Sequence, residues 1–225
     1  LLLDKNKFPT LLGKSVLHLK YNKTLSVESN IDDMNAVVPN IPHGKFMRGL
    51  AKYRWGIKHD AMEDFEECIC MCFQISPMPC HLLALSIKYQ IEVMIVEERY
   101  KEANEKAKIL SNVLQKECRG KEMEDFISFG VRLKCWELPI EKDCKFYENM
   151  TRAMTILCFP NCSEYGESRI DKRNKNNAEQ SPGEFDRSLI HAANLLENAK
   201  KVNVRDDYRV YHWQGFANIL SLNQK

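Results

Sequence analysis

Residues 49–77 of the chain are GLAKYRWGIKHDAMEDFEECICMCFQISP, a pattern typical of two antiparallel helices joined by one tight turn. The first helix is expected over 45–54, because apolar side chains there recur three and four positions apart and so share one face. These side chains are Phe46, Leu50 and Tyr53. Gly56 follows as a helix-breaking residue, so we expect the turn at this glycine.

The second helix is expected to begin near Asp60, whose carboxylate can accept hydrogen bonds from the N–H groups of the first turn. Its apolar stripe has the spacing of a helix face: Ala61, Phe65, Cys68, Ile69 and Cys72. Pro77 marks its end. Gly49 lies inside the first helix, where glycine costs about 1 kcal/mol relative to alanine. We therefore expect Gly49 and Ala61 to allow a close approach of the two helices, with Phe65 filling the space between them.

Five residues of this hairpin stand at the spacing of a helix–turn–helix unit of about 34 residues: Gly49, Gly56, Ala61, Phe65 and Cys68. In this spacing the chain resembles the tetratricopeptide-repeat superfamily, most clearly over residues 45–77. It departs from that pattern at Lys45 and Arg48, which replace the usual early Trp and Leu, and its closing proline comes about one turn late. An unrelated helical hairpin is the alternative interpretation.

We expect an all-α fold in which stacked antiparallel helical hairpins form a tetratricopeptide-like α-solenoid. Residues 1–42 are expected to be an N-terminal helical extension, although 15–21 also fits a short strand. Residues 43–160 are expected to hold three hairpins, each too thin to bury its apolar face alone. Their predicted positions are 45–77, 81–118 and 123–158. In the second hairpin Glu98 replaces the turn glycine, so the resemblance is weaker there.

The composition changes at residues 161–183, which contain few apolar side chains and are predicted to be a flexible loop. Residues 184–225 return to a helical pattern and are expected to continue the repeat array. Within them WQGFANI (213–219) echoes MRGLAKY (47–53), so the last helix resembles the first half of another unit. Its second helix is expected beyond residue 225, and we therefore expect at least one end of the solenoid to be an interface.

Composition excludes few function classes. The 225 residues are 44% hydrophobic and 28% charged, which is ordinary for a globular protein, and the net charge of +2 argues neither for nor against binding of nucleic acid. We expect no membrane contact, because no stretch approaches the ~20 apolar residues of a membrane span. The nine cysteines are odd in number and scattered, which suits reduced thiols. Together with the lack of a signal-sequence pattern, this predicts an intracellular location, cytoplasmic or nuclear.

No arrangement of residues indicates catalysis, so the chain is predicted not to be an enzyme and to hold no cofactor. The run Cys68-x-Cys70-x-Cys72 suggests three thiolate ligands for zinc. On a helix, however, residues two apart point in nearly opposite directions, so only Cys68 and Cys72 can share a face. We therefore predict a buried structural role for these cysteines and no metal site.

Binding of a protein partner is the predicted function: a scaffold within a larger complex that holds a peptide or helix in the groove of the superhelix. The candidate partner-binding residues are Phe46, Arg48, Leu50, Lys52, Tyr53, Trp213 and Phe216. Some tetratricopeptide proteins hold a chaperone's C-terminal carboxylate with Lys and Asn. The resemblance places those two positions on Phe46 and Leu50, which speaks against such a clamp.

Two alternatives remain open. One is RNA binding, which would need a single basic stripe with aromatic faces such as Tyr53 and Trp55. Its basic members would be Arg48, Lys52, Arg54, Lys58 and the run 172–175. The other is that the chain is the helical regulatory region of a larger enzyme. The oligomeric state is not predicted.

Overall fold

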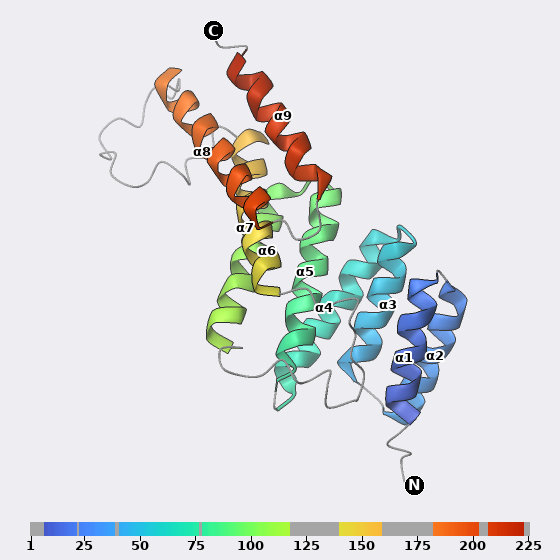
Figure 1. Cartoon of the computed structure of the whole chain (residues 1–225). Helices are drawn as coiled ribbons and strands as arrows, with labels where there is room; N and C mark the ends of the chain where they lie inside the picture. The colour runs from blue at the N-terminus through green and yellow to red at the C-terminus, as the bar shows by residue number, and fades with distance from the viewer. Residues whose placement is uncertain are drawn as a thin grey trace.

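The computed structural model describes residues 7–21, 23–38, 41–76, 78–117, 140–158, 182–202 and 207–222. Within these ranges the regular structure is helical and contains no strand, so the predicted all-α class is confirmed (Figure 1). The α-helices are α1 (Lys7–Lys20), α2 (Thr24–Val37), α3 (Pro42–Arg54), α4 (Lys58–Gln74), α5 (Cys80–Val96), α6 (Tyr100–Asn112), α7 (Ile140–Cys158), α8 (Pro182–Lys201) and α9 (Tyr208–Leu222). A π-helical turn, Val113–Glu117, continues α6.

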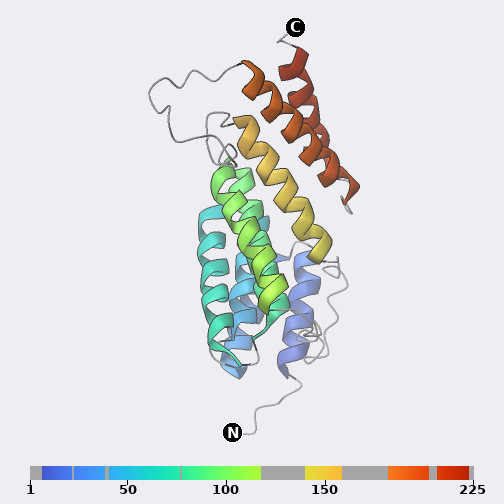
Figure 2. The same cartoon turned by 90° about the vertical axis from the view of Figure 1, so that its left-hand side faces the viewer.

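The helices pack in neighbouring pairs, each one against the helix that follows it among the described residues. The odd-numbered helices also contact one another in series, α1 with α3, α3 with α5, α5 with α7 and α7 with α9. As Figure 1 and Figure 2 show, the first pair and α9 lie toward opposite ends of the molecule. Helices α3, α5 and α7 therefore each contact the even-numbered helix before them and the one after them, and α9 packs mainly on α8.

The turns within the first three pairs use one hydrogen-bonding pattern. The backbone N–H of Lys23 donates to the carbonyl of His18, that of Ile57 to Lys52 and that of Arg99 to Met94, over 2.8, 3.0 and 2.9 Å. In each case the N–H bonds to the carbonyl five positions earlier, at the end of the first helix of the pair, as in a Schellman motif. The expected turn glycine, Gly56, has φ +81°.

Glu98 occupies the equivalent position in the turn between α5 and α6 and has φ +60° although it carries a side chain. Its N–H bonds to Ile95, just as the N–H of Gly56 bonds to Tyr53. The missing glycine therefore leaves the turn intact but places a non-glycine residue in the left-handed region, at a cost of roughly 1–2 kcal/mol.

Because of this cost, we expect Glu98→Gly to raise the free energy of unfolding by about 1 kcal/mol. Gly56→Ala, the matched change in the other turn, should lower it by about 1 kcal/mol. Urea denaturation followed by far-ultraviolet circular dichroism measures both. A stability loss in Glu98→Gly would show that the Glu98 side chain contributes more than the backbone strain costs.

Several predicted boundaries need correction. Residues 15–20 belong to α1, so the alternative of a strand there is wrong. Helix α3 begins at Pro42 rather than at 45, since proline at the first helical position loses no hydrogen bond. Helix α8 likewise begins at Pro182, inside the predicted loop. The rest of that loop, and the predicted helix over 123–138, lie outside the described residues.

The central hairpin packs as its small residues predict. A Cβ atom placed on Gly49 would lie 2.9 Å from Cε1 of Phe65, closer than real side chains come. Ala61 and Phe65 are fully buried, and the Phe65 ring stacks on that of Tyr89 with the centroids 5.6 Å apart. The glycine thus allows α4 to lie close to α3, and Phe65 fills the space and extends the contact to α5.

Two groups of buried apolar residues form the core. The larger runs from α1 to α9 and includes Ala199 of α8 and Val210 of α9, and the smaller is built from α7, α8 and α9. Trp213 of α9 packs against both groups, with its ring edge to face against Tyr100 of α6 at 5.5 Å between centroids. Trp213 therefore joins the last helix to the body of the molecule.

Candidate functional site

The apolar candidates on α3 belong to the core. Phe46 and Leu50 are almost completely buried, and the Phe46 ring contacts those of Phe65 and Tyr89 at centroid distances of 6.0 and 5.9 Å. Because both side chains are buried in the core, they offer almost no surface to a partner. Their three- and four-residue spacing, which predicts the helix, equally predicts this burial.

The basic candidates on α3 are engaged by α4. Nη2 of Arg48 lies 2.5 Å from Oδ1 of the buried Asp64, and Nζ of Lys52 lies 2.9 Å from its Oδ2. The hydrogen bond with Asp64 raises the pKa of Arg48, and burial opposes it only in part. Arg54 also donates to a backbone carbonyl, that of Leu19. Three members of the basic stripe needed for RNA binding are therefore paired within the chain.

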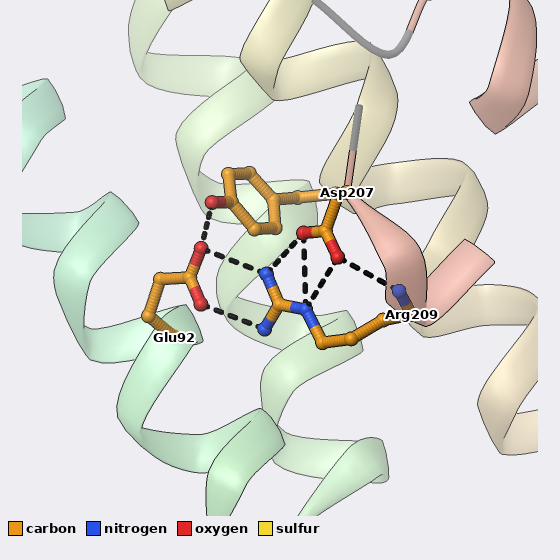
Figure 3. A network of polar contacts seen from close by, with 4 residues as sticks. Glu92, Asp207 and Arg209 are labelled. Carbon is orange, nitrogen blue, oxygen red and sulfur yellow. Dashed lines mark hydrogen bonds and ion pairs between the residues drawn. The ribbon is translucent and has the colours of Figure 1, made fainter. Parts of the chain in front are cut away.

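Polar side chains from the odd-numbered helices α5, α7 and α9 meet in one network, which Figure 3 shows from close by. Arg209, at the start of α9, donates from Nη1 to Oε2 of Glu92 on α5 over 2.8 Å. Its Nη2 donates to Oε1 of Glu92 over 3.2 Å and to Oδ2 of Asp207 over 2.5 Å. The hydroxyl of Tyr147 on α7 donates to Oε1 of Glu92. One guanidinium thus holds the carboxylate of Asp207, two positions before it, and that of Glu92 on α5, 117 positions away.

The start of α9 explains how Arg209 is aimed. Asp207 precedes the helix, and its Oδ1 accepts the backbone N–H of Arg209 over 3.0 Å, which caps the first turn. The same carboxylate accepts from Nε of Arg209 over 2.9 Å. Helix capping and side-chain orientation therefore depend on one residue.

The network is mostly buried and carries one net negative charge if both carboxylates are ionised. The exposed fractions of the Arg209, Glu92 and Asp207 side chains are 20%, 12% and 15%. Burial alone would lower the pKa of Arg209, but hydrogen bonds to Asp207 and Glu92 outweigh it and raise that pKa. Burial, and then the charge of Glu92, raise the pKa of the neighbouring Tyr53 to about 12. The candidate Tyr53 of α3 therefore lies beside this network as a neutral phenol.

The candidates on α9 differ in exposure. Trp213 is half-buried between the two core groups, and its ring meets that of Phe216 edge to face at 5.6 Å. Phe216 is exposed. Of the seven predicted residues, Phe216 therefore offers the clearest apolar surface to a partner, and Tyr53 and Trp213 lie partly at the surface.

Glu92, Tyr147 and Arg209 were not predicted from the sequence. Glu92 and Arg209 are 117 positions apart, and no local pattern connects them. Asp207 alone had a readable signal, since an aspartate directly before a helical segment is a preferred cap.

The cysteines divide as the helical geometry predicts. Cys68 and Cys72 are buried, whereas Cys70 between them is exposed. The Cys68 thiol accepts a hydrogen bond from Oγ of Ser86 on α5 over 3.2 Å, so it contributes to the α4–α5 contact.

The chain matches no model of a known protein family, and no curated protein matches it. Its structure defines the class: an all-α protein whose described helices pack in neighbouring pairs. None of the described helices is long and apolar enough to cross a membrane.

Proposed function

We propose that this protein is a tetratricopeptide-like helical-repeat scaffold that binds a peptide or helix of a partner protein on the face of its odd-numbered helices. The observation that carries the proposal is the serial contact from α1 through α3, α5 and α7 to α9. In stacked helical pairs this arrangement gives an extended surface to which successive units each contribute one helix.

The turns support the repeat interpretation. The capping N–H groups of Lys23 and Ile57 are 34 positions apart and bond in the same way. That spacing equals the tetratricopeptide period. The third such turn, at Arg99, follows that at Ile57 after 42 positions. The interval is longer because the segment from the start of α4 to the end of α5 is longer than the segment from the start of α2 to the end of α3.

The pairing of the basic side chains favours a protein partner over RNA. Arg48 and Lys52 form ion pairs with Asp64, and Arg54 donates to a backbone carbonyl. Phosphate binding instead needs clustered cations that are free to replace counterions. The network around Arg209 adds no positive excess, because two carboxylates surround its guanidinium.

Affinity purification from native extract, with and without nuclease, tests the proposal when wild type is compared with Tyr53→Ser. The control variant is Ile109→Ser, which changes an exposed apolar residue on the even-numbered α6. We expect a small set of proteins that survives nuclease, at least fivefold less recovery with Tyr53→Ser at equal folded fraction, and unchanged recovery with Ile109→Ser. Loss of all partners on nuclease treatment would contradict the proposal and favour RNA binding.

A further inference from the structure

The turns that end α1 and α3 form one edge of the molecule. Arg54, the last residue of α3, donates from Nη1 to the carbonyl of Leu19 near the end of α1, so the C-terminal ends of these two helices lie close together (Figure 1). Basic and apolar side chains gather at this edge. We call the following six residues the tip: Tyr21, Lys23, Arg54, Trp55, Ile57 and Lys58.

The apolar members of the tip are exposed. The exposed fractions of Tyr21, Trp55 and Ile57 are 66%, 37% and 45%. Tyr21 comes two positions before Lys23, and Trp55 comes two positions before Ile57, and the N–H groups of Lys23 and Ile57 are those that cap the two turns. Both turns therefore carry an aromatic side chain at the same position.

The basic members of the tip have no carboxylate partner among the described residues. Lys23 and Arg54 are exposed and Lys58 is half-buried, and none of the three forms an ion pair there. The hydrogen bond of Arg54 goes to a neutral carbonyl, so its charge is not compensated. Asp60, the next carboxylate after Lys58, lies 3.7 Å from Nζ of Lys52. The tip therefore combines three positive charges with exposed apolar side chains.

The third turn of this kind has a different chemistry. The N–H of Arg99 caps it, and the position two before, which is aromatic in the first two turns, is occupied by Glu97. Arg99 pairs with Glu97 and with Glu102 at 3.0 and 2.6 Å. The same turn thus forms without an exposed aromatic ring and without an unpaired cation, so the fold does not require the chemistry of the tip.

Cations beside exposed aromatic and aliphatic side chains complement an anionic lipid surface. Anionic headgroups attract Lys and Arg, and the membrane–water interface accommodates Trp and Tyr. We propose that the tip docks the protein on the surface of a membrane that contains anionic lipids. The apolar members enter the boundary between headgroups and acyl chains, and the basic members contact the headgroups. Surface contact of this kind needs no membrane-spanning helix.

Two observations favour a lipid surface over RNA. Single-stranded RNA is held along a basic groove that follows its backbone. The basic surface of the tip does not continue along α3, because Arg48 and Lys52 are paired with Asp64. In addition, Ile57 is aliphatic and gives a base no ring to stack on, whereas acyl chains would remove its exposed surface from water.

Co-sedimentation of the whole chain with lipid vesicles tests the inference. We expect at least tenfold stronger binding to vesicles of equal phosphatidylcholine and phosphatidylserine than to phosphatidylcholine alone. Lys23→Gln with Lys58→Gln should weaken binding to the mixed vesicles about 25-fold, since each cation near such a surface contributes about fivefold. Lys145→Gln with Lys201→Gln is the matched control, because it changes the net charge equally at exposed positions of α7 and α8, and should leave binding within twofold.

A second pair of variants tests the apolar members. Ile57→Ser should weaken binding to the mixed vesicles at least fivefold. Ile109→Ser on α6 is its matched control, since the exposed fraction of Ile109 is also 45%, and should have no effect. Circular dichroism gives the folded fraction of each variant, and binding is compared at equal folded fraction.

Equal binding of wild type to both kinds of vesicle, or unchanged binding after Lys23→Gln with Lys58→Gln, would overturn the inference. Fluorescence anisotropy with a labelled single-stranded RNA examines the other anionic partner. RNA binding that the double variant abolishes, without vesicle binding, would assign the tip to nucleic acid and contradict the inference. Dimerisation in sedimentation velocity that Ile57→Ser abolishes, again without vesicle binding, would assign the tip to a second copy of the chain and contradict it as well.

Discussion

Phe65→Ala should lower the free energy of unfolding by about 3–5 kcal/mol, the cost of removing a large aromatic side chain from a packed core. The ring is fully buried, stacks on Tyr89 and occupies the space opened by Gly49. Urea denaturation followed by circular dichroism measures the change. Phe73→Ala is the matched control on the same helix, because Phe73 is exposed, and should change stability by no more than about 0.5 kcal/mol.

A double-mutant cycle tests whether Gly49 acts through the Phe65 ring. Gly49→Ala alone should destabilise by about 1 kcal/mol, since overpacking against the ring exceeds the gain in helix propensity. In a Phe65→Leu background the same change should become neutral or stabilising, because the closest atoms to the new Cβ are Cε1 and Cδ1 of that ring. Additive effects would mean that Phe65 does not account for the glycine.

Arg209→Met should lower the free energy of unfolding by about 3 kcal/mol, because Glu92 and Asp207 then remain close together and mostly buried without their cation. Adding Glu92→Gln should recover part of the loss. Equal stability of Arg209→Met and wild type would show that the network contributes nothing to the fold.

Arg99→Met provides the control for this effect. Arg99 also bridges two carboxylates, Glu97 at 3.0 Å and Glu102 at 2.6 Å, but these three side chains lie at the surface. Exposed ion pairs are worth only about 0–1 kcal/mol, so its loss should be a small fraction of that in Arg209→Met. The comparison separates burial from the number of ion pairs.

The sequence predicts the helices and the central packing well because both depend on residues close together in the chain. The spacing of Phe46, Leu50 and Tyr53 predicts α3, and Gly49 correctly predicts that the Phe65 ring approaches this helix closely. The same local information did not predict which charged side chains on α3 are paired within the chain. Arg48 and Lys52 look free in the sequence, yet Asp64, sixteen positions after Arg48, binds both.

Long-range polar contacts are what the sequence could not reveal. Glu92 lies in an apolar helix, and nothing near it predicts that a guanidinium 117 positions later will bind it. Such a contact depends on how the three odd-numbered helices α5, α7 and α9 are placed, which no single repeat specifies. Tyr53 was predicted as a binding residue from its helix face, and the structure adds that burial, and then the charge of Glu92, raise the pKa of its phenol.

The reach of Arg209 from α9 to α5 has a consequence for how the molecule comes apart. In a linear array of helix pairs, the last pair can fray while the others stay folded, because each pair depends only on its neighbours. Here, release of α9 would leave the carboxylate of Glu92 without its cation in the middle of the chain. Separation of α9 from the rest of the molecule therefore costs free energy at Glu92 of α5. This cost couples the unfolding of α9 to that of α5 and makes unfolding more cooperative.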